Sequence, residues 1–267
     1  MKILRHLTPH GPAYAALQPD GSAREITGDI LGEFRVTDRV VTPGKRLAPL
    51  APANLLCIGL NYKKHAAESN QAPPKHPVLF IKNTAAVQNP GDPIELPVKL
   101  ASHRVDYECE LAIVIGRRCK NATRANALDF VLGYTCANDV SARDWQRDGG
   151  GGQWCQGKSF DTFCPLGPVL VTKDEIPDPN HLRIRTLLNG ETMQDWNTND
   201  MIFDVPALIE FLSASKTLLP GTVILTGTPH GVGFARNPPV WLKAGDTVTI
   251  DIEKIGALTN PVVNESP

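Results

Sequence analysis

The chain has 267 residues, with 27 Lys and Arg against 28 Asp and Glu, so its formal net charge is −1. A balance this close to neutrality argues against nucleic-acid and polybasic membrane-surface partners, which require a field of one sign. Hydrophobic residues make up 42 %, enough for a folded core, and the 21 % of charged residues is too few for a disordered or coiled-coil chain. The 23 prolines and 22 glycines favour a loop-rich, strand-rich fold over a helical bundle.

Neither a membrane span nor a secretory signal is expected. No apolar run approaches the ~18 residues that a membrane helix needs, and Pro9 interrupts the N-terminal segment before an apolar signal region can form. The six cysteines include no C-x-x-C pair, which argues against a zinc site and a disulfide framework and fits a reducing compartment. We therefore expect a soluble, cytoplasmic protein.

Residues 1–50 are expected to form a small β-rich domain, and residues 51–267 a second, larger one. Strands at 1–8 and 12–17 flank a turn at His10-Gly11, and the Pro-rich segment 43–52 is typical of a linker. The second domain is predicted to contain strands at 54–59, 77–82, 105–116, 131–136, 168–171, 182–189, 223–226 and 247–252.

Helices are predicted to be few. The pattern indicates short helices at 61–67 and 123–129, a helical turn at 139–146 and a clear amphipathic helix at 205–213. Four successive glycines at 149–152 predict a mobile segment, and Asn189-Gly190 predicts a tight hairpin. Many short strands with few helices favour a mostly β fold, a mixed β-sandwich, roll or barrel, over a doubly wound sheet.

Three acidic residues form the most informative constellation. Glu108 and Glu110 lie two residues apart at the start of an apolar strand, so they share one face of it. Alone, this pair also fits an edge strand that faces solvent. Asp139 comes after the next apolar strand, and three convergent carboxylates without His or Cys suit a hard divalent cation such as Mg²⁺ or Mn²⁺ rather than zinc.

The segment 152–159 matches the G-x-x-x-x-G-K-[ST] phosphate-loop pattern, with Lys158 as its lysine. That motif needs a strand before it and a helix after it. Glycines precede this segment, and Pro165 interrupts the residues on its C-terminal side, so we reject a nucleotide-binding function.

Six blocks stand out along residues 56–263: 59–68 (Gly-Leu-Asn-Tyr-Lys-Lys-His-Ala-Ala-Glu), 77–82 (Pro-Val-Leu-Phe-Ile-Lys), 107–111, 138–146, 157–161 and 225–233. Together and in this order they resemble the signature segments of the fumarylacetoacetate hydrolase superfamily. The segments 154–168 and 197–203 further resemble a branch with oxaloacetate tautomerase activity, close to acylpyruvate hydrolases and oxaloacetate decarboxylases.

The resemblance implies a role for nine residues. Glu108, Glu110 and Asp139 would be the ligands of Mg²⁺, with Mn²⁺ or Ca²⁺ as alternatives, and Lys158 would stabilise an enolate beside the ion. The remaining residues are the substrate-pocket residues Arg143, Gln146 and Thr228, and the lid pair His65 and Glu68, in which Glu68 would act as the general base.

The expected substrate is a small 2-oxo or 1,3-dioxo acid activated as a metal-stabilised enolate. Hydrolysis of a C–C bond in an acylpyruvate and keto–enol tautomerisation of oxaloacetate are the leading reactions. Oxaloacetate decarboxylation and isomerisation of a 2-hydroxymuconate-type double bond are the alternatives, and a binding protein without activity belongs to a different class. The resemblance also implies a homodimer.

Overall fold

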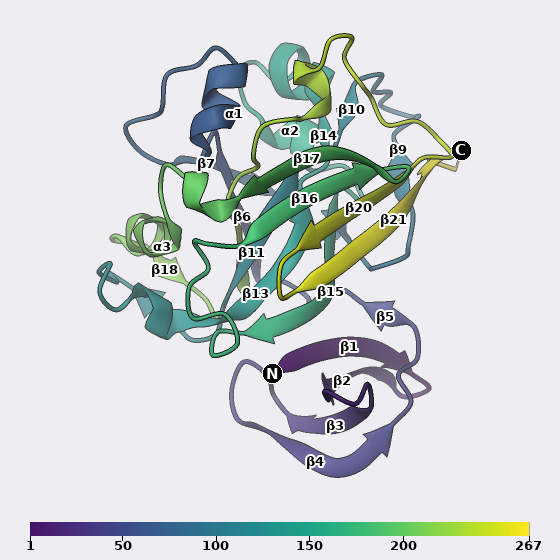
Figure 1. The fold of residues 1–267 in the computed structure, drawn as a ribbon, viewed down its shortest axis with the longest axis vertical. Coiled ribbons are helices and arrows are strands. Elements are labelled where there is room, and N and C mark those ends of the chain that lie inside the picture. Colours follow the sequence, from purple (N-terminus) through teal and green to yellow (C-terminus); the bar gives the residue numbers. More distant parts are fainter. Residues whose placement is uncertain (267) are drawn as a thin grey trace.

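The computed structural model describes residues 1–266, and most of its strands belong to two open sheets (Figure 1). The larger sheet has twelve strands in the order β4-β3-β2-β1-β15-β13-β11-β19-β6-β7, with β5 and β8 attached to β1 and β15. Its strands are β1 (Lys2–Thr8), β2 (Gly11–Leu17), β3 (Ala23–Gly28), β4 (Phe34–Val41), β5 (Arg46–Leu47), β6 (Asn54–Gly59), β7 (Val78–Lys82), β8 (Val87–Gln88), β11 (Cys109–Ile115), β13 (Val131–Asn138), β15 (Cys164–Thr172) and β19 (Thr222–Leu225).

The second sheet has five strands in the order β17-β16-β20-β21-β9. They are β9 (Ile94–Leu96), β16 (Arg183–Leu188), β17 (Glu191–Asn197), β20 (Thr247–Ile252) and β21 (Gly256–Asn264). Two short ribbons pair β10 (Val105–Asp106) with β14 (Ser141–Ala142) and β12 (Cys119–Lys120) with β18 (Thr217–Leu218).

Helices are few and short. The α-helices are α1 (Lys63–Glu68), α2 (Cys155–Lys158) and α3 (Val205–Ser213). Single turns of 3₁₀-helix occur at η1 (Thr84–Ala86), η2 (Ala127–Phe130), η4 (Thr198–Asp200) and η5 (Gly233–Ala235), and a π-helical turn at η3 (Trp145–Gly149). Every helix of the described chain is too short or too polar to serve as a membrane span.

The central strand β11 is buried along its whole length and separates two hydrophobic cores. Leu111 and Ile113 point into the core shared with the five-stranded sheet. Ala112 and Val114 point into the other core, which is formed by residues of the large sheet, including its N-terminal strands. Because side chains alternate along a strand, Glu110 lies on the same face as Ala112 and Val114. The face of β11 that packs into this second core therefore carries Glu110 at its N-terminal end.

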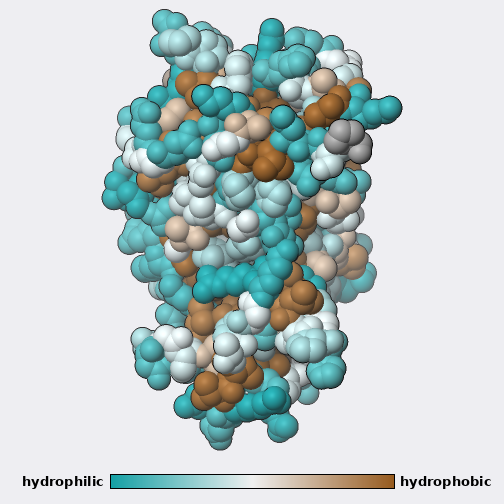
Figure 2. Space-filling model, turned by 90° about the vertical axis from the view of Figure 1, so that its right-hand side faces the viewer, coloured by the Kyte–Doolittle hydropathy of each residue, from teal (hydrophilic) through white to brown (hydrophobic). Residues whose placement is uncertain are grey.

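The N-terminal strands extend the large sheet rather than forming a separate one. Lys2 and Ile3 of β1 pair with Val171 and Leu170 of β15, and β1 to β4 form the narrow lower end of the molecule (Figures 1 and 2). On the face in Figure 2, hydrophobic residues form small separate patches among hydrophilic ones. The division of the chain at residue 50 stays a prediction.

The mostly β class predicted from the sequence is confirmed, and none of the sheets closes into a barrel. The strands at 54–59 and 247–252 and the helix at 205–213 have the predicted bounds. Asn189 and Gly190 both have positive φ, 54° and 83°, and join β16 to β17 in the predicted hairpin.

Two helical predictions were wrong in their bounds. Residues 123–126 form a turn in which the Asn126 side chain accepts a hydrogen bond from the Thr123 backbone N–H at 2.8 Å, and only Ala127–Phe130 is helical. At 139–146 the chain first forms β14, because Ser141 and Ala142 pair with β10, and the helical turn starts only at Arg143. The prediction also missed β3, β4 and β21, whose residues are largely polar or half-exposed.

Candidate active site

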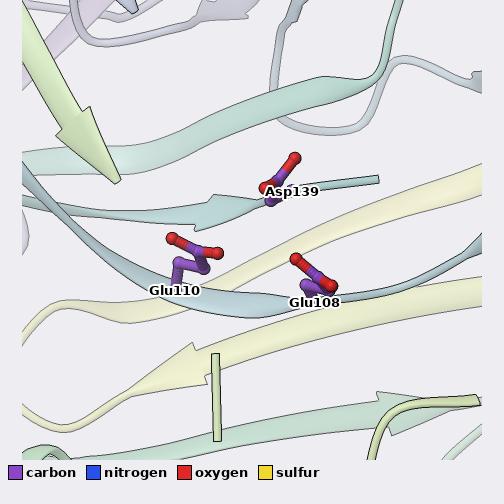
Figure 3. A group of neighbouring side chains, drawn as sticks. All are labelled: Glu108, Glu110 and Asp139. Carbon is purple, nitrogen blue, oxygen red and sulfur yellow. The ribbon is translucent and has the colours of Figure 1, made fainter. Parts of the chain in front are cut away.

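The pairing of β11 with β13 brings the acidic residues together. Glu110 lies opposite Ala137 in this pairing, and Asp139 comes directly after the last residue of β13. The Asp139 backbone N–H donates to the Glu108 carbonyl oxygen at 2.9 Å, which continues the pairing beyond β11. Glu110 in β11, Glu108 just before this strand and Asp139 just after β13 thus lie close together, as Figure 3 shows.

The three carboxylates are close enough to hold one metal ion. One oxygen each of Glu108, Glu110 and Asp139 lies within 4.8 Å of the others, and all three residues are buried. Oxygen-only ligands of this kind suit a hard divalent cation. The structure therefore brings together the three ligands expected from the sequence.

The charges around this triad do not balance. Four buried carboxylates face three buried cations in the site: Asp106, Glu108, Glu110 and Asp139 against Lys82, Arg143 and Lys158. Within residues 1–266, Glu110 forms no ion pair, and its Oε2 accepts a hydrogen bond from the Gly227 backbone N–H at 2.7 Å. An unpaired buried carboxylate is costly. A divalent cation would offset that charge, so the residues present fit a metal ion.

The two glutamates respond to this environment in opposite directions. Burial alone would raise the pKa of Glu108, but the Lys158 ammonium and the Arg143 guanidinium outweigh it and hold the pKa well below its usual value. Burial, reinforced by the Asp139 and Glu108 carboxylates, raises the pKa of Glu110 well above its usual value. Without a metal ion, Glu110 thus takes up a proton more readily than Glu108.

Lys158 bridges two members of the triad. Its Nζ donates to Glu108 Oε2 at 2.8 Å and to Asp139 Oδ2 at 2.7 Å. Burial alone would lower the pKa of Lys158, but the carboxylates of Asp139 and Glu108 raise it, so the ammonium stays charged. Buried between carboxylates, this side chain is not arranged to bind a nucleotide phosphate.

A close backbone approach carries Lys158 to this position. At Gly157, a Cβ would lie 2.5 Å from the Gln146 backbone nitrogen and 2.6 Å from the Ala142 carbonyl oxygen. Only glycine therefore lets α2 pack this tightly against β14 and η3.

Two charged residues of the site were not predicted from the sequence. Lys82, at the end of β7, donates to Asp139 Oδ1 at 2.5 Å and to the Val140 carbonyl oxygen at 3.1 Å. Asp106 Oδ2 accepts two hydrogen bonds from Arg143, at 2.8 and 2.9 Å. Both residues stand in or beside the recognised blocks, but Lys82 ends an apolar strand, and such lysines usually face solvent.

Arg143 lies between this second acid and the triad. It pairs with Glu108 Oε1 at 2.7 Å and donates to Gln146 Oε1 at 3.0 Å. Thr228, which was also predicted to border the substrate, accepts a hydrogen bond from Gln194 Nε2 at 2.9 Å. All three predicted pocket residues line one cavity together with the glutamates and Lys158.

This cavity contains about 640 Å³ of empty space, including its open mouth. The other residues that line it are aromatic, aliphatic or polar: Ile58, Gly59, Leu60, His65, Ser69, Gln71, Phe80, Arg147, Trp154 and Phe234.

The predicted contact between the lid residues His65 and Glu68 is formed, but only His65 lines the cavity. His65 Nδ1 lies 2.7 Å from Glu68 Oε1 on α1, as the i, i+3 spacing predicts. His65 lines the cavity, whereas Glu68 is not among its lining residues and accepts a hydrogen bond from the Gly231 backbone N–H at 2.9 Å. The structure thus places the imidazole, rather than the carboxylate, toward a bound substrate, and the role of Glu68 as base stays a prediction.

Comparison with known proteins places the chain in a family. Residues 54–263 match the family described as fumarylacetoacetate (FAA) hydrolase C-terminal, and residues 1–57 match one described as Rv2993c-like, N-terminal. A protein named oxaloacetate tautomerase fahd2, mitochondrial, from Xenopus laevis is 49 % identical over 250 residues, covering 93 % of this chain and 75 % of the relative. The human oxaloacetate tautomerase FAHD2A, mitochondrial, is 49 % identical over 218 residues, covering 81 % of this chain and 69 % of the relative.

A solved structure has the same fold over almost the entire chain. The 5-carboxymethyl-2-hydroxymuconate delta-isomerase from Mycobacterium smegmatis superimposes with a TM-score of 0.86 at 43 % identity, covering 99 % of this chain and 100 % of the other. A 2-hydroxyhepta-2,4-diene-1,7-dioate isomerase from Mycobacterium marinum superimposes with a TM-score of 0.85 at 43 % identity, covering 100 % of both chains. The chain belongs to the fumarylacetoacetate hydrolase family of enzymes.

Proposed function

We propose that this enzyme is a Mg²⁺-dependent tautomerase that interconverts the enol and keto forms of oxaloacetate. The observation that carries the proposal is the buried triad of Glu108, Glu110 and Asp139, with its uncompensated negative charge, in a cavity that also presents an ammonium and an imidazole. The relatives named as oxaloacetate tautomerases and 2-hydroxymuconate-type isomerases support this choice, since both reactions move a proton through an enolate without breaking a C–C bond.

A divalent ion held by the triad would act as a Lewis acid on the 2-oxo acid. The residues of the chain supply the rest. The Lys158 ammonium, held by Glu108 and Asp139, would stabilise negative charge on the C2 oxygen. In the keto-to-enol direction, the His65 imidazole would take a proton from C3 and the C2 oxygen would take a proton from water. His65 would then return its proton to water, so that the net change is the movement of one proton from C3 to the C2 oxygen. Glu68 would orient the imidazole and stabilise its charged form.

The test is a tautomerase assay with and without metal. Pure enol-oxaloacetate is monitored by the loss of its enol absorbance in the presence of Mg²⁺, Mn²⁺, Ca²⁺ or EDTA. We expect metal-dependent acceleration that Lys158→Met removes. Acceleration that persists in EDTA, or that is unchanged in this variant, would refute the proposal.

Acylpyruvate hydrolysis and oxaloacetate decarboxylation share the same enolate chemistry and need separate assays. Acetylpyruvate cleavage is measured by pyruvate release, and decarboxylation by carbon dioxide release from oxaloacetate. For the proposed tautomerase, both rates should be small beside the rate of enol loss. If either rate exceeds it, the proposed reaction is wrong, whether or not the triad binds Mg²⁺.

A further inference from the structure

Arg147 is a cation of the cavity that the proposed reaction does not use. It lines the cavity, lies one residue after Gln146 in η3, and is exposed. Within residues 1–266 its guanidinium has neither an ion pair nor a hydrogen bond. The neighbouring Asp148 pairs instead with Arg104, at 3.7 Å. Arg147 therefore has free N–H donors at the mouth of the site.

The position of this guanidinium is defined by an aromatic ring. Its Cζ lies 4.3 Å from the centre of the Phe234 ring, and the Arg143 Cζ lies 4.6 Å from the same centre. The Phe234 backbone N–H donates to Asp106 Oδ2 at 3.1 Å, the oxygen that also binds Arg143. Stacking on a ring holds a guanidinium while leaving the donors at its edge available for a planar anion.

The two stacked arginines differ in their charge balance. Arg143 is neutralised by Asp106 and Glu108, so it belongs to the buried ionic network of the metal site. Arg147 lies on the same ring without an anionic partner in the described chain. The lining of the cavity thus includes both glutamates of the triad and an exposed guanidinium that has no anionic partner in the described chain.

From this arrangement we propose that Arg147 binds the second carboxylate of the substrate, so that the site selects 2-oxo dicarboxylates over 2-oxo monocarboxylates. The inference rests on the proposed function, in which the 2-oxo acid end of the substrate lies at the triad. The other end of oxaloacetate is a carboxylate, and a guanidinium fork matches it with two parallel hydrogen bonds. Arg147 is then a substrate-binding residue that sets specificity.

The experiment compares matched ligands and matched variants. Oxaloacetate and pyruvate share the 2-oxo acid end and differ in the distal carboxylate, so calorimetry with the Mg²⁺-loaded protein isolates the contribution of this carboxylate to binding. Oxaloacetate is added as its equilibrium mixture of keto and enol forms, so that no net turnover occurs. The variants are Arg147→Gln and Arg147→Lys. The control is Arg118→Gln, which removes an exposed arginine outside the cavity that makes no ion pair in the described chain.

In Arg147→Gln we expect oxaloacetate affinity to fall roughly tenfold to a hundredfold, the range for losing a hydrogen bond to a charged group. Pyruvate affinity should stay within about twofold, because pyruvate does not reach Arg147. Arg147→Lys should retain part of the preference, since it keeps the charge but not the fork. Arg118→Gln should behave as the wild type. In turnover, KM for oxaloacetate should rise far more than kcat falls.

Two results would overturn the inference: an unchanged ratio of oxaloacetate to pyruvate affinity in Arg147→Gln, whether neither affinity falls or both fall equally, or no oxaloacetate binding to the wild type. Failure of the proposed function has a different signature. If the wild type prefers oxaloacetate in an Arg147-dependent way but does not accelerate enol loss, the binding inference stands and the tautomerase proposal falls.

Discussion

Glu110 lies in β11 and Glu108 just before it, two residues apart, yet their surroundings shift the pKa values of the two carboxyl groups in opposite directions. Lys158 and Arg143 both contact Glu108, whereas Glu110 has only a backbone donor within the described chain. The two glutamates therefore have different roles in the site. Glu108 anchors the ionic network, and Glu110 carries the charge that a metal ion would neutralise.

Neutral variants of these glutamates should therefore differ in stability. In Glu110→Gln we expect Mg²⁺ affinity to fall on the order of 100-fold, while the metal-free protein is at least as stable as the wild type because a poorly compensated buried acid is gone. Glu108→Gln should also weaken Mg²⁺ binding, but it should lower the free energy of unfolding of the metal-free protein by about 3 kcal/mol, because Lys158 and Arg143 lose a partner.

Calorimetric Mg²⁺ titration and urea unfolding in EDTA measure these two quantities. Equal destabilisation by both substitutions would contradict this charge balance. Unchanged Mg²⁺ affinity in both variants would show that the triad is not the metal site.

Neutral variants can also distinguish the roles of the lid residues His65 and Glu68. His65→Gln should lower kcat by roughly 10²- to 10⁴-fold, the usual contribution of a proton-transfer group, with Mg²⁺ affinity unchanged. Glu68→Gln should lower kcat less, because this residue does not line the cavity and keeps its contact with Gly231. Steady-state kinetics decides the order. A larger loss in Glu68→Gln would restore Glu68 as the general base expected from the sequence.

At the scale of elements, α2 is a four-residue helix whose position depends on one glycine. In Gly157→Ala the new methyl group would meet the backbone of Ala142 and Gln146, so α2 would have to move away and take Lys158 with it. We expect a loss of about 1–3 kcal/mol in stability, as for overpacked sites, and a fall in kcat.

Thermal melts and kinetics test this prediction beside Gly32→Ala. At Gly32 the nearest atoms to a Cβ, those of Asp29, are 3.6 Å away or more, which is ordinary contact. A Gly157→Ala protein with the stability and activity of this control would show that α2 does not need the close approach.

Elements stabilised by local interactions were the ones that the sequence predicted well. The helix Val205–Ser213 has its apolar residues at helical spacing, and Asp204 caps it by accepting a hydrogen bond from the Ala207 N–H. The segment 123–129 lacks such support, since the Asn126 side chain binds the backbone and favours a turn. The strands β3 and β4 were missed because pairing, rather than an apolar alternation, makes them strands.

At the scale of the whole molecule, metal binding and folding are linked through Glu110. Its pKa in the folded, metal-free protein lies above the usual value, so its contribution to stability is fully present below the pKa of the unfolded chain. That contribution is lost as pH rises through the folded pKa. Mg²⁺ requires the ionised carboxylate, so binding below the folded pKa must release a proton.

We therefore expect Mg²⁺ to raise the melting temperature, and the increment to grow as pH rises above the usual pKa of a glutamate, because Glu110, whose pKa is raised, loses its proton there. Melting curves with Mg²⁺ or EDTA at several pH values measure it. The increment should depend less on pH in Glu110→Gln. An increment that shrinks with rising pH would contradict the assignment.

The homodimer and the cytoplasmic location stay predictions. Analytical ultracentrifugation of the full-length protein would decide the first.

The sequence by itself determined the family, the mostly β class and the identities of the three acidic residues, because strand periodicity and the recognised blocks are properties of neighbouring residues. Only the tertiary structure decided which charges meet. Lys82, Asp106 and Arg143 come from three separate segments, at β7, at β10 and just after β14. The β11–β13 register brings Glu110 near Asp139, and the close approach of α2 to β14 brings Lys158 to the triad. Charge compensation depends on distance in space, which the order of residues along the chain does not specify.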